Sequence, residues 1–504
     1  MSRKNQEIGK ALLIPMLITK TKFLAGIQCL KRLYLTVHAP ELAAQPDESD
    51  QSIIDQGREV GLLAGQMFPG GVVVDARNRE EAVRATRELI ENPEVPAIFE
   101  GAFEHRGVFV RVDILERCGD RRWRLIEVKS TTDVKDPHLH DIAIQHRVVT
   151  RSGVDLEASF LAHVSRDYVY EGGPIDASHF FRIRNLTRQV EKLQPELTVQ
   201  LRSEFRVLAM PEAPNIPAGR QCSNPFTCEF FDHCNPPIPD DHILRLPRIH
   251  ASTVAKLREL GIHTIRDIPE NYPLTDRLRR ACVCVQMGRP WFSPGLKAEL
   301  EGLTYPLYFA DFETINPCIP RFPRMRPYDQ LPFQWSVHVQ MQPCAAPEHF
   351  EFLATDTSDP RPTFITTLCD ALGDRGSIIV YHQQFESQRL ADLASWQPEF
   401  SRRIDKIQRR LWDLLPVVRD HVYHPAFGGS YSLKSVLPAL VPEMTYEGMA
   451  VADGQAAGIV WESLIGDDCS VAERQRKQKA LLDYCGQDTL GMVRLVEKLQ
   501  RVST

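Results

Sequence analysis

The sequence predicts an α/β protein of several domains, and three observations support this fold class. The chain has 504 residues, which is too long for a single hydrophobic core. Short apolar segments with a period of two alternate with longer segments of helical period in both halves of the chain. A proline-rich stretch at 236–240 separates the two halves. We therefore predict an α/β multidomain architecture with domains at 1–238, 239–298 and 299–504.

Composition and charge restrict the class of protein further. The net charge of −6 means that a nucleic-acid partner would have to be met by local basic patches. Twelve cysteines without an export signal favour a reducing cytoplasm over a disulfide scaffold. Residues 1–16 superficially resemble a signal peptide, but Pro15 interrupts a short apolar run, so we expect a tail leading into the first strand. No segment approaches the length of a membrane span, and we expect no membrane partner.

Two apolar segments, 108–115 and 125–130, carry the first candidate site. A glycine–aspartate pair lies between them, which favours a hairpin. Glu127 and Lys129 are two residues apart and share one face of a strand, and the hairpin would bring Asp113 to them. Two carboxylates suit Mg²⁺ or Mn²⁺, and a lysine beside them can steady a phosphate or an attacking water. The alternative is a surface salt bridge on a strand.

The remaining elements of the first part follow from residue patterns. Helices are predicted where apolar positions are spaced by three and four, and strands where β-branched residues run together. We predict helices at 23–35, 53–68 and 80–91, strands at 72–74 and 98–103, and a helix through Asp141, Gln145 and Val149.

The spacing Asp113-x(13)-Glu127-x-Lys129 resembles the PD-(D/E)xK nuclease superfamily, in particular the RecB-type nucleases. Val112 stands where the motif name has its proline. The resemblance implies a restriction-endonuclease-like α/β core and a metal-dependent nuclease centre.

The same resemblance implies two further site residues. RecB-type nucleases usually carry a glutamine and a tyrosine four residues apart on the next helix; this chain has Gln145 but Val149 in place of the tyrosine. The family also has a metal ligand on an early helix. Glu59 is the best candidate for it, with Glu100 as the rival.

Three closely spaced cysteines, Cys222, Cys228 and Cys234, lie among prolines near the end of the first part. This spacing is hard to explain by core packing and favours metal binding. Zinc requires four ligands, and His233 could be the fourth. An iron–sulfur cluster also requires four ligands, usually thiolates.

Cys29 completes a second resemblance. Iron–sulfur nucleases of the AddB type and of CRISPR adaptation hold a cluster with one cysteine before the nuclease core and three after it. The resemblance implies a [4Fe–4S] cluster, with Zn²⁺ as the alternative. The first late spacing here is five residues where the family usually has two. The implied cluster ligands are Cys29, Cys222, Cys228 and Cys234.

The middle of the chain predicts a helical connector. Residues 249–269 read as a helix, a Leu-Gly-Ile turn and the start of a second helix, which resembles a helix-hairpin-helix element. Such turns offer backbone N–H groups to a phosphate. The alternative is a plain pair of linker helices. A further helix is predicted at 278–287.

A second set of acidic residues lies in the last 200 residues of the chain. Asp311 and Glu313 lie two apart on a predicted strand at 307–314, so they share one face. Tyr484 and Asp488 are four apart on a predicted helix and share one side of it. Strands are also predicted at 334–339, from 350, and at 377–382, with a helix at 363–372.

This order of motifs resembles the DEDDy 3′–5′ exonucleases of the DnaQ-like, RNase H-fold class. The resemblance implies that Tyr484 orients or deprotonates the attacking water. Glu386 stands where the family has aspartate, and Asp413 is the fallback ligand. The implied ligands of two divalent ions are Asp311, Glu313, Glu386 and Asp488.

Basic stretches flank these acids at 321–326, 402–410 and 474–479. The first, with prolines and an interleaved phenylalanine, is the best suited to contact a nucleic-acid strand.

The whole arrangement resembles a bacterial family of fused proteins of unsettled function, with a RecB-type iron–sulfur nuclease followed by a DnaQ-like domain. It predicts a metal-dependent DNA nuclease with two active centres, acting on single-stranded DNA or free ends in repair, recombination or defence. A ribonuclease and a nucleic-acid-binding scaffold without turnover are the alternatives. No P-loop is present, so unwinding would require a helicase or another repair or defence protein as partner.

Overall fold

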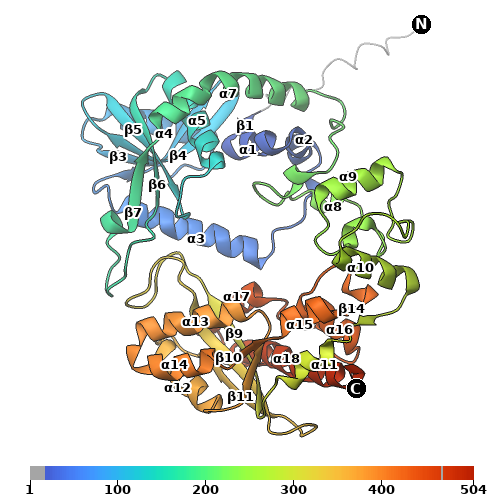
Figure 1. Cartoon of the computed structure of the whole chain (residues 1–504). Helices are drawn as coiled ribbons and strands as arrows, with labels where there is room; N and C mark the ends of the chain where they lie inside the picture. The colour runs from blue at the N-terminus through green and yellow to red at the C-terminus, as the bar shows by residue number, and fades with distance from the viewer. Residues whose placement is uncertain (1–16, 467–468, 504) are drawn as a thin grey trace. The chain divides into compact units, whose positions relative to one another are not determined.

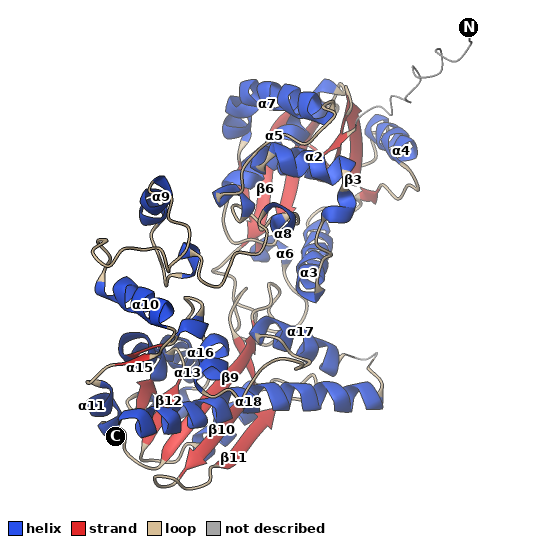
Figure 2. Cartoon of the chain, turned by 90° about the vertical axis from the view of Figure 1, so that its right-hand side faces the viewer, coloured by secondary structure: helices blue, strands red, loops and turns tan. Residues whose placement is uncertain are grey.

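The computed structural model describes residues 17–466 and 469–503. Its contacts divide the chain into two compact units. Unit 1 ends at Pro237 and also includes Pro317–Tyr328, whereas unit 2 holds the rest. Residues 239–298, predicted as a separate connector, therefore group with unit 2. Both units are mixed α/β structures (Figures 1 and 2). The predicted N-terminal tail lies outside the described residues.

A mixed sheet forms the centre of unit 1. Neighbours β3, β4 and β5 are antiparallel, whereas β5 and β6 are parallel and are joined through a helix. The predicted hairpin and the strands on either side of it are present. The sheet order is β2 (Val72–Val73), β3 (Ala97–His105), β4 (Val108–Arg117), β5 (Arg122–Lys129), β6 (Asp155–Val164) and β7 (Phe181–Asn185), with β1 (Ile18–Thr19) beside β4.

Helices cover both faces of this sheet. Helices α1, α2, α4, α5 and α7 pack on one face, and α3 packs on the other (Figure 1). The single helix predicted at 23–35 is wrong, because the backbone is extended at Cys29 (φ −163°, ψ 121°) and divides it in two. The helices are α1 (Lys20–Gln28), α2 (Leu30–His38), α3 (Glu48–Gly65), α4 (Arg79–Glu91), α5 (Asp136–Arg151), α6 (Ala177–Phe180), α7 (Thr187–Leu208) and α8 (Phe231–Cys234).

A second mixed sheet forms the centre of unit 2. Its strand β9 lies in the middle, antiparallel to β10 and parallel to β12. The order is β11 (Glu348–Leu353), β10 (Leu331–Gln340), β9 (Leu307–Ile315), β12 (Ser377–Val380) and β13 (Leu411–Asp413). A separate two-stranded ribbon pairs β8 (Trp291–Phe292) with β14 (Val422–Tyr423).

The helices of unit 2 also divide between the two faces of its sheet. Helices α12, α13 and α14 pack against the face that carries Phe312 and Val337. Helices α10, α15, α16 and α18 pack against the face that carries Phe309. The helices are α9 (Ala251–Glu259), α10 (Asp276–Met287), α11 (Leu296–Glu301), α12 (Arg361–Ala371), α13 (Gln383–Trp396), α14 (Ser401–Gln408), α15 (Leu414–His421), α16 (Leu433–Leu440), α17 (Gly454–Ile465) and α18 (Val471–Ser503).

The predicted second helix of the hairpin element is not found where it was expected. After α9, the turn around Gly261 takes a left-handed conformation (φ 74°), and the chain continues without a helix until Asp276. Helix α10 itself agrees with the helix predicted at 278–287, and Gly288 caps it with φ 64°.

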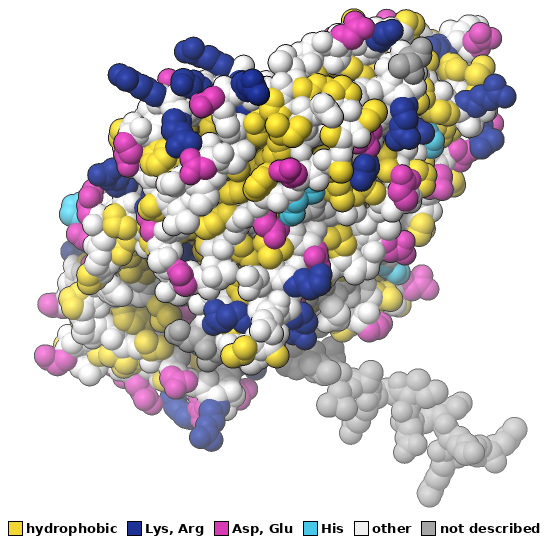
Figure 3. All heavy atoms as spheres, turned by 90° about the horizontal axis from the view of Figure 1, so that it is seen from below, with side chains coloured by type: hydrophobic (Ala, Val, Ile, Leu, Met, Phe, Trp, Pro, Cys, Tyr) yellow, Lys and Arg dark blue, Asp and Glu magenta, His cyan; other side chains and the backbone are white. Residues whose placement is uncertain are grey.

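Among the described helices, none is long and apolar enough to cross a membrane. Lysine and arginine side chains are interspersed with acidic ones on the face drawn in Figure 3, in keeping with the small net charge.

Candidate functional site

The hairpin and helix of unit 1 bring the predicted nuclease residues together. Lys129 Nζ lies 2.6 Å from Glu127 Oε1 and 2.7 Å from Asp141 Oδ2. Gln145 Nε2 donates to Glu127 Oε2 at 2.7 Å and to Asp141 Oδ1 at 2.8 Å. Asp113 joins from the neighbouring strand, where its Oδ2 accepts the backbone N–H of Val128 at 2.7 Å. We call these five side chains, from Asp113 to Gln145, the first centre.

A residue that sequence reasoning missed completes this centre. Lys20, the first residue of α1, places its Nζ 2.9 Å from Glu127 Oε1 and 3.5 Å from Asp141 Oδ1. Thr19 caps the helix and pairs with β4, which fixes where α1 begins. Two ammonium groups therefore share two buried carboxylates.

Burial and these two lysines set the protonation of the first centre. Burial, followed by the neighbouring charge of Glu127, raises the pKa of Asp113 to about 8. Burial also disfavours the charged form of Glu127, but Lys129 and Lys20 outweigh it and hold the pKa of Glu127 well below its usual range. The pKa of Asp141 is raised by burial and by Glu127. Such a crowded set of acids gains from a bound cation.

The two candidates for the early metal ligand, on α3 and β3, take no part in the hydrogen bonds and ion pairs recorded for this cluster in the described chain. Glu59 is exposed on α3 and, in the described chain, forms no ion pair with the first centre. Glu100 is also exposed, on β3, where it takes a left-handed backbone (φ 57°). In the pairing of β3 with β4, Phe99 pairs with Ile114 and Gly101 pairs with Val112, and the position between them, Glu100 and Asp113, is not paired. The irregular backbone thus lies directly opposite Asp113.

The four predicted cluster cysteines line one small cavity in unit 1. Cys29 caps α1, and the other three follow in the loop after α7. Gln28 Nε2 ties α1 to this loop, donating to the carbonyls of Gln221 and Phe226 at 2.7 Å each. His233, the alternative zinc ligand, is not among the lining residues. The thiols that line the cavity belong to Cys29, Cys222, Cys228 and Cys234.

The second candidate site is built around strand β9 in unit 2. Ligand atoms of Asp311, Glu313 and Cys485 all lie within 4.8 Å of one another and could hold a metal ion. Cys485 was not predicted; its Sγ lies 3.8 Å from Asp311 Oδ2, beside Tyr484 on α18. Burial raises the pKa of the Cys485 thiol well above its usual range, so it is a neutral neighbour of the acids.

The structure separates the two candidates for the next ligand. Both oxygens of Asp413 are already used: they accept backbone N–H groups of His382, Gln383 and Leu415 at 3.0 Å each. Glu386 is 2 % exposed, and its Oε2 has no hydrogen-bond partner in the described chain. Burial and the charge of Asp311 raise its pKa well above the usual range. Glu386 therefore keeps a buried carboxylate oxygen without a hydrogen-bond partner in the described chain, whereas Asp413 caps backbone N–H groups.

Two tyrosines and a lysine surround Asp488 on α18. Tyr446, which was not predicted, donates its hydroxyl to Asp488 Oδ1. Lys434 Nζ lies 5.2 Å from the ring centre of Tyr484 and donates to a backbone carbonyl. Burial and the surrounding acids raise the pKa of the Tyr484 hydroxyl, so it is protonated.

Burial and mutual repulsion dominate the electrostatics of this second centre, Asp311, Glu313, Glu386, Asp488 and Tyr484. Burial and Asp488 raise the pKa of Asp311 to about 8. Burial raises the pKa of Asp488 to about 6, and that of Glu313 rises well above its usual range. The first helical residue of α17, Gly454, comes so close that a Cβ there would lie 3.2 Å from Glu313 Oε2.

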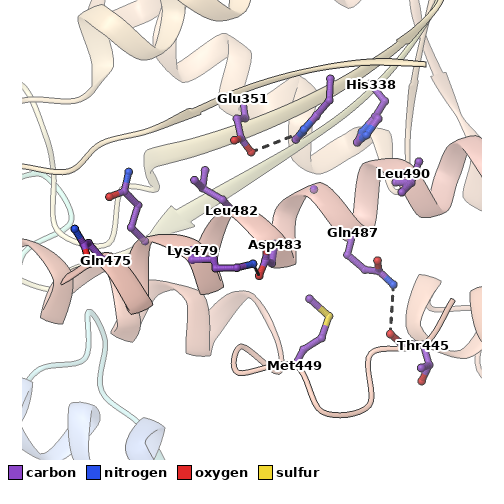
Figure 4. A pocket seen from close by; sticks show the side chains of 13 residues that line it. His338, Glu351, Thr445, Met449, Gln475, Lys479, Leu482, Asp483, Gln487 and Leu490 are labelled. Atoms are coloured by element: carbon purple, nitrogen blue, oxygen red, sulfur yellow. Dashed lines mark hydrogen bonds and ion pairs between the residues drawn. The ribbon is translucent and has the colours of Figure 1, made fainter. Parts of the chain in front are cut away.

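The other side of α18 borders a pocket of about 660 Å³ (Figure 4). His338 and His349 stack there with ring centres 4.2 Å apart and planes 11° from parallel. Their hydrogen bonds run through Ser336 and Thr489. Parallel imidazoles cannot direct both lone pairs at one ion, so this histidine pair is not a chelating site.

The basic stretches have different roles in the structure. Arg410 donates to four backbone carbonyls in the 372–376 turn, which makes it a structural residue. Arg403 pairs with Asp370 at 2.8 Å, and Lys479 pairs with Asp483 at 2.5 Å. The 321–326 stretch belongs to the segment that groups with unit 1.

Comparison with protein families matches residues 308–432 to DUF2779, a domain of unknown function. The match includes Asp311, Glu313 and Glu386 and ends before Tyr484 and Asp488. No curated protein matches the chain.

Proposed function

We propose that this chain is a metal-dependent nuclease with two active centres, a RecB-type centre in unit 1 and a DnaQ-like exonuclease centre in unit 2. The observation that carries the proposal is the convergence of four largely buried acids, with a tyrosine beside them, on the central strand of unit 2. Buried carboxyls with raised pKa values repel one another unless cations neutralise them. The four are Asp311, Glu313, Glu386 and Asp488.

These residues fit two divalent ions, Mg²⁺ or Mn²⁺, which prefer carboxylate oxygen. Such ions supply Lewis acidity at the attacking and leaving oxygens of a phosphodiester. Tyr484 would hold the attacking water by a hydrogen bond, in place of a nucleophilic side chain. Water adds to phosphorus, the P–O3′ bond breaks, and the 3′ end recedes one nucleotide at a time. A site whose acids are largely buried suits a single free end of a nucleic acid better than continuous duplex.

The first centre supports a second hydrolytic activity. Asp113 and Glu127 would hold a cation, Lys129 would contact the scissile phosphate, and Gln145 would orient Glu127. We propose a restriction-endonuclease-like core for unit 1 and an RNase H-like core for unit 2, acting on DNA in the cytoplasm.

The cysteine cavity supports a [4Fe–4S] cluster. Tetrahedral zinc with bonds of about 2.3 Å would draw its sulfur ligands to about 3.8 Å from one another. In the described chain, no three of these thiols come within 4.8 Å of one another. The thiols are thus not arranged as a preformed zinc site, and the cavity, of about 20 Å³, would have to widen around a cluster. By binding one cluster, the four thiolates would link α1 to the segment after α7 and stabilise the fold of unit 1.

The test is a nuclease assay on anaerobically purified protein with Mg²⁺ or Mn²⁺, in which variants that inactivate one centre at a time are compared with the wild type. Lys129→Ala should remove only the first activity and Asp311→Ala only the 3′–5′ activity, on DNA labelled at either end. The double variant should be inactive. Cleavage by the double variant at the wild-type rate would overturn the proposal.

End-labelled RNA is run alongside the DNA. Cleavage of RNA alone would replace the DNA assignment with a ribonuclease. No cleavage of either polymer with either metal would favour a binding scaffold.

A further inference from the structure

A second hollow in unit 1, away from the first centre, is lined by basic side chains. It measures about 260 Å³ and lies between the β3–β4 turn, the end of α5 and the middle of α7. The lining residues contribute four guanidinium groups and one imidazole, and no carboxylate. The basic ones are His105, Arg106, Arg147, Arg151 and Arg202.

The charge of this pocket is not compensated within the described chain. None of its four arginines takes part in an ion pair there, and Arg147 only contacts Gln194 oxygens at 3.4 and 3.5 Å. Burial lowers the pKa of His105, and the nearby Arg106 and Arg151 lower it further. Arg106, Arg151 and Arg202 are exposed and Arg147 is half-buried, so solvent screens part of this charge. The four guanidinium groups nevertheless line one hollow.

The local backbone presents these groups to the pocket. Arg106 sits at the tip of the β3–β4 turn in a left-handed conformation (φ 50°). Arg147 and Arg151 are four apart on α5 and share one side of the helix. Phe205 and Leu201 of α7 provide an apolar wall, on which a base or sugar can pack.

The pocket is connected to the first centre through two elements. Gln145 of the centre precedes Arg151 by six residues on α5, about 9 Å of helix. Strand β4 runs from Val108 at the pocket to Asp113 at the centre, about 17 Å of extended chain. These lengths correspond to a few nucleotides of a single strand.

We propose that this pocket binds phosphate groups. Guanidinium groups grip phosphate oxygens through paired hydrogen bonds, and converging arginines favour the multiple charge of phosphate over a single carboxylate. The source can be the backbone of a nucleic-acid strand held at the first centre or a free phosphorylated small molecule. Only the strand assignment rests on the proposed function.

Binding of single-stranded DNA to the full chain tests the strand. Fluorescence anisotropy is measured over a salt series without divalent cations, which stops hydrolysis. The Arg151→Gln, Arg202→Gln double variant should bind about tenfold more weakly. The slope of log affinity against log salt should become shallower by about 1.4, since each lost phosphate contact removes about 0.7. Arg188→Gln, an exposed arginine on the same helix α7, is the matched control and should bind as the wild type does.

Thermal unfolding with inorganic pyrophosphate and with a nucleoside triphosphate tests the small-molecule source. Stabilisation of the wild type and the Arg188→Gln control, but not of the double variant, would assign the pocket to a free phosphorylated ligand. Unchanged DNA affinity and salt slope in the double variant, with no phosphate compound acting through these arginines, would overturn the proposal. Neither arm reads hydrolysis, so loss of the nuclease proposal and loss of this pocket are distinguishable.

Discussion

Lys20 is the residue that most changes the chemistry expected of the first centre. Its ammonium contacts the same two carboxylates as Lys129. With Lys129 alone, one positive charge would face the two carboxylates of Glu127 and Asp141, and one negative charge would remain unbalanced. Lys20 therefore helps to hold Glu127 ionised. Under the proposed function, it lies beside the carboxylates that would bind the cation.

Removing this contact should slow the first centre without affecting the second. Lys20→Ala, made in the Asp311→Ala background, is expected to lower cleavage by about 10–100-fold, the range for losing a side chain that orients a metal ligand. The initial rate on end-labelled DNA measures it. Lys22→Ala is the matched control, because Lys22 lies on the same helix and its side chain donates to the Leu17 carbonyl at 3.4 Å and not to the first centre in the described chain. Equal rates for Lys20→Ala and the control would exclude the role.

Substitutions of Glu386 and Asp413 distinguish a metal ligand from a residue that caps backbone N–H groups. Glu386→Gln should weaken Mn²⁺ binding to unit 2 by at least tenfold without lowering the free energy of unfolding, because it removes a buried acid whose pKa is raised. Asp413→Ala should cost about 1–2 kcal/mol of unfolding free energy, since it leaves three backbone N–H groups without their acceptor. Titration with Mn²⁺ in the Lys129→Ala background and denaturant unfolding give the two readouts. The reverse pattern would make Asp413 the ligand.

Glu204 is a buried acid with no part in either centre. It is fully buried on α7, and Gln200 is its hydrogen-bond partner, at 2.8 Å. Burial raises its pKa to about 8, so the folded state holds a proton that the unfolded state releases near pH 4.5. Its cost to stability is absent below pH 4.5 and grows as pH rises towards 8.

Glu204→Gln should therefore stabilise unit 1 most at high pH. We expect a gain of up to about 4 kcal/mol at pH 8 and about 1 kcal/mol or less at pH 5. Denaturant unfolding at both pH values measures it, and Glu196→Gln, exposed on the same helix, should show no pH-dependent gain. A gain of equal size at both pH values would mean that the effect is packing and not titration.

At the level of elements, the sequence predicts strands well where apolar and polar side chains alternate. The strands that carry Asp113, Glu127 and Asp311 were predictable, because a strand with one buried face has an apolar residue at every second position. The helical spacing of four from Gln145 also points back to Asp141, which could have been found. Lys20 could not, since its contact with Glu127 spans 107 residues and depends on how α1 docks.

The break between α1 and α2 illustrates the same limit. Apolar spacing continues through Cys29, so the pattern predicts one helix over 23–35. The extended backbone at Cys29 instead turns α2 away and directs the thiol into the cysteine cavity. Tertiary contacts of a single residue override a periodic signal there.

Helix α1 links the cysteine cavity to the first centre, with Cys29 at one end and Lys20 at the other. Cys228→Ser should abolish the visible absorbance of the cluster and lower cleavage by the first centre, while the 3′–5′ activity of unit 2 persists. Cys118→Ser is the control, because its thiol bonds Glu157 and lines no part of the cavity. Full first-centre activity in a colourless Cys228→Ser protein would show that α1 does not depend on the cluster.

Over the whole molecule, the two units should respond differently to pH and metal. In unit 2 the raised pKa values of Asp311 and Asp488, about 8 and about 6, mean that metal-free stability is greatest below pH 4 and falls as pH rises through 6 to 8. In unit 1 the lowered pKa of Glu127 acts in the opposite direction to the raised pKa of Asp113, so the pH effect of the first centre is smaller. The remaining pH effect of Glu204 in unit 1 is removed by Glu204→Gln.

Calorimetry of the full chain carrying Glu204→Gln, in a chelator that spares the cluster, should therefore show one transition that moves down by about 5 °C or more between pH 5 and pH 8, and Mn²⁺ should restore it. Because the carboxyls are protonated at pH 5, Mn²⁺ should have little effect there. Glu313→Gln removes one of the repelling acids, so it should raise this transition at pH 8 without metal and reduce the response to Mn²⁺. A transition that Mn²⁺ shifts equally at both pH values would mean that the cation binds elsewhere than among these acids.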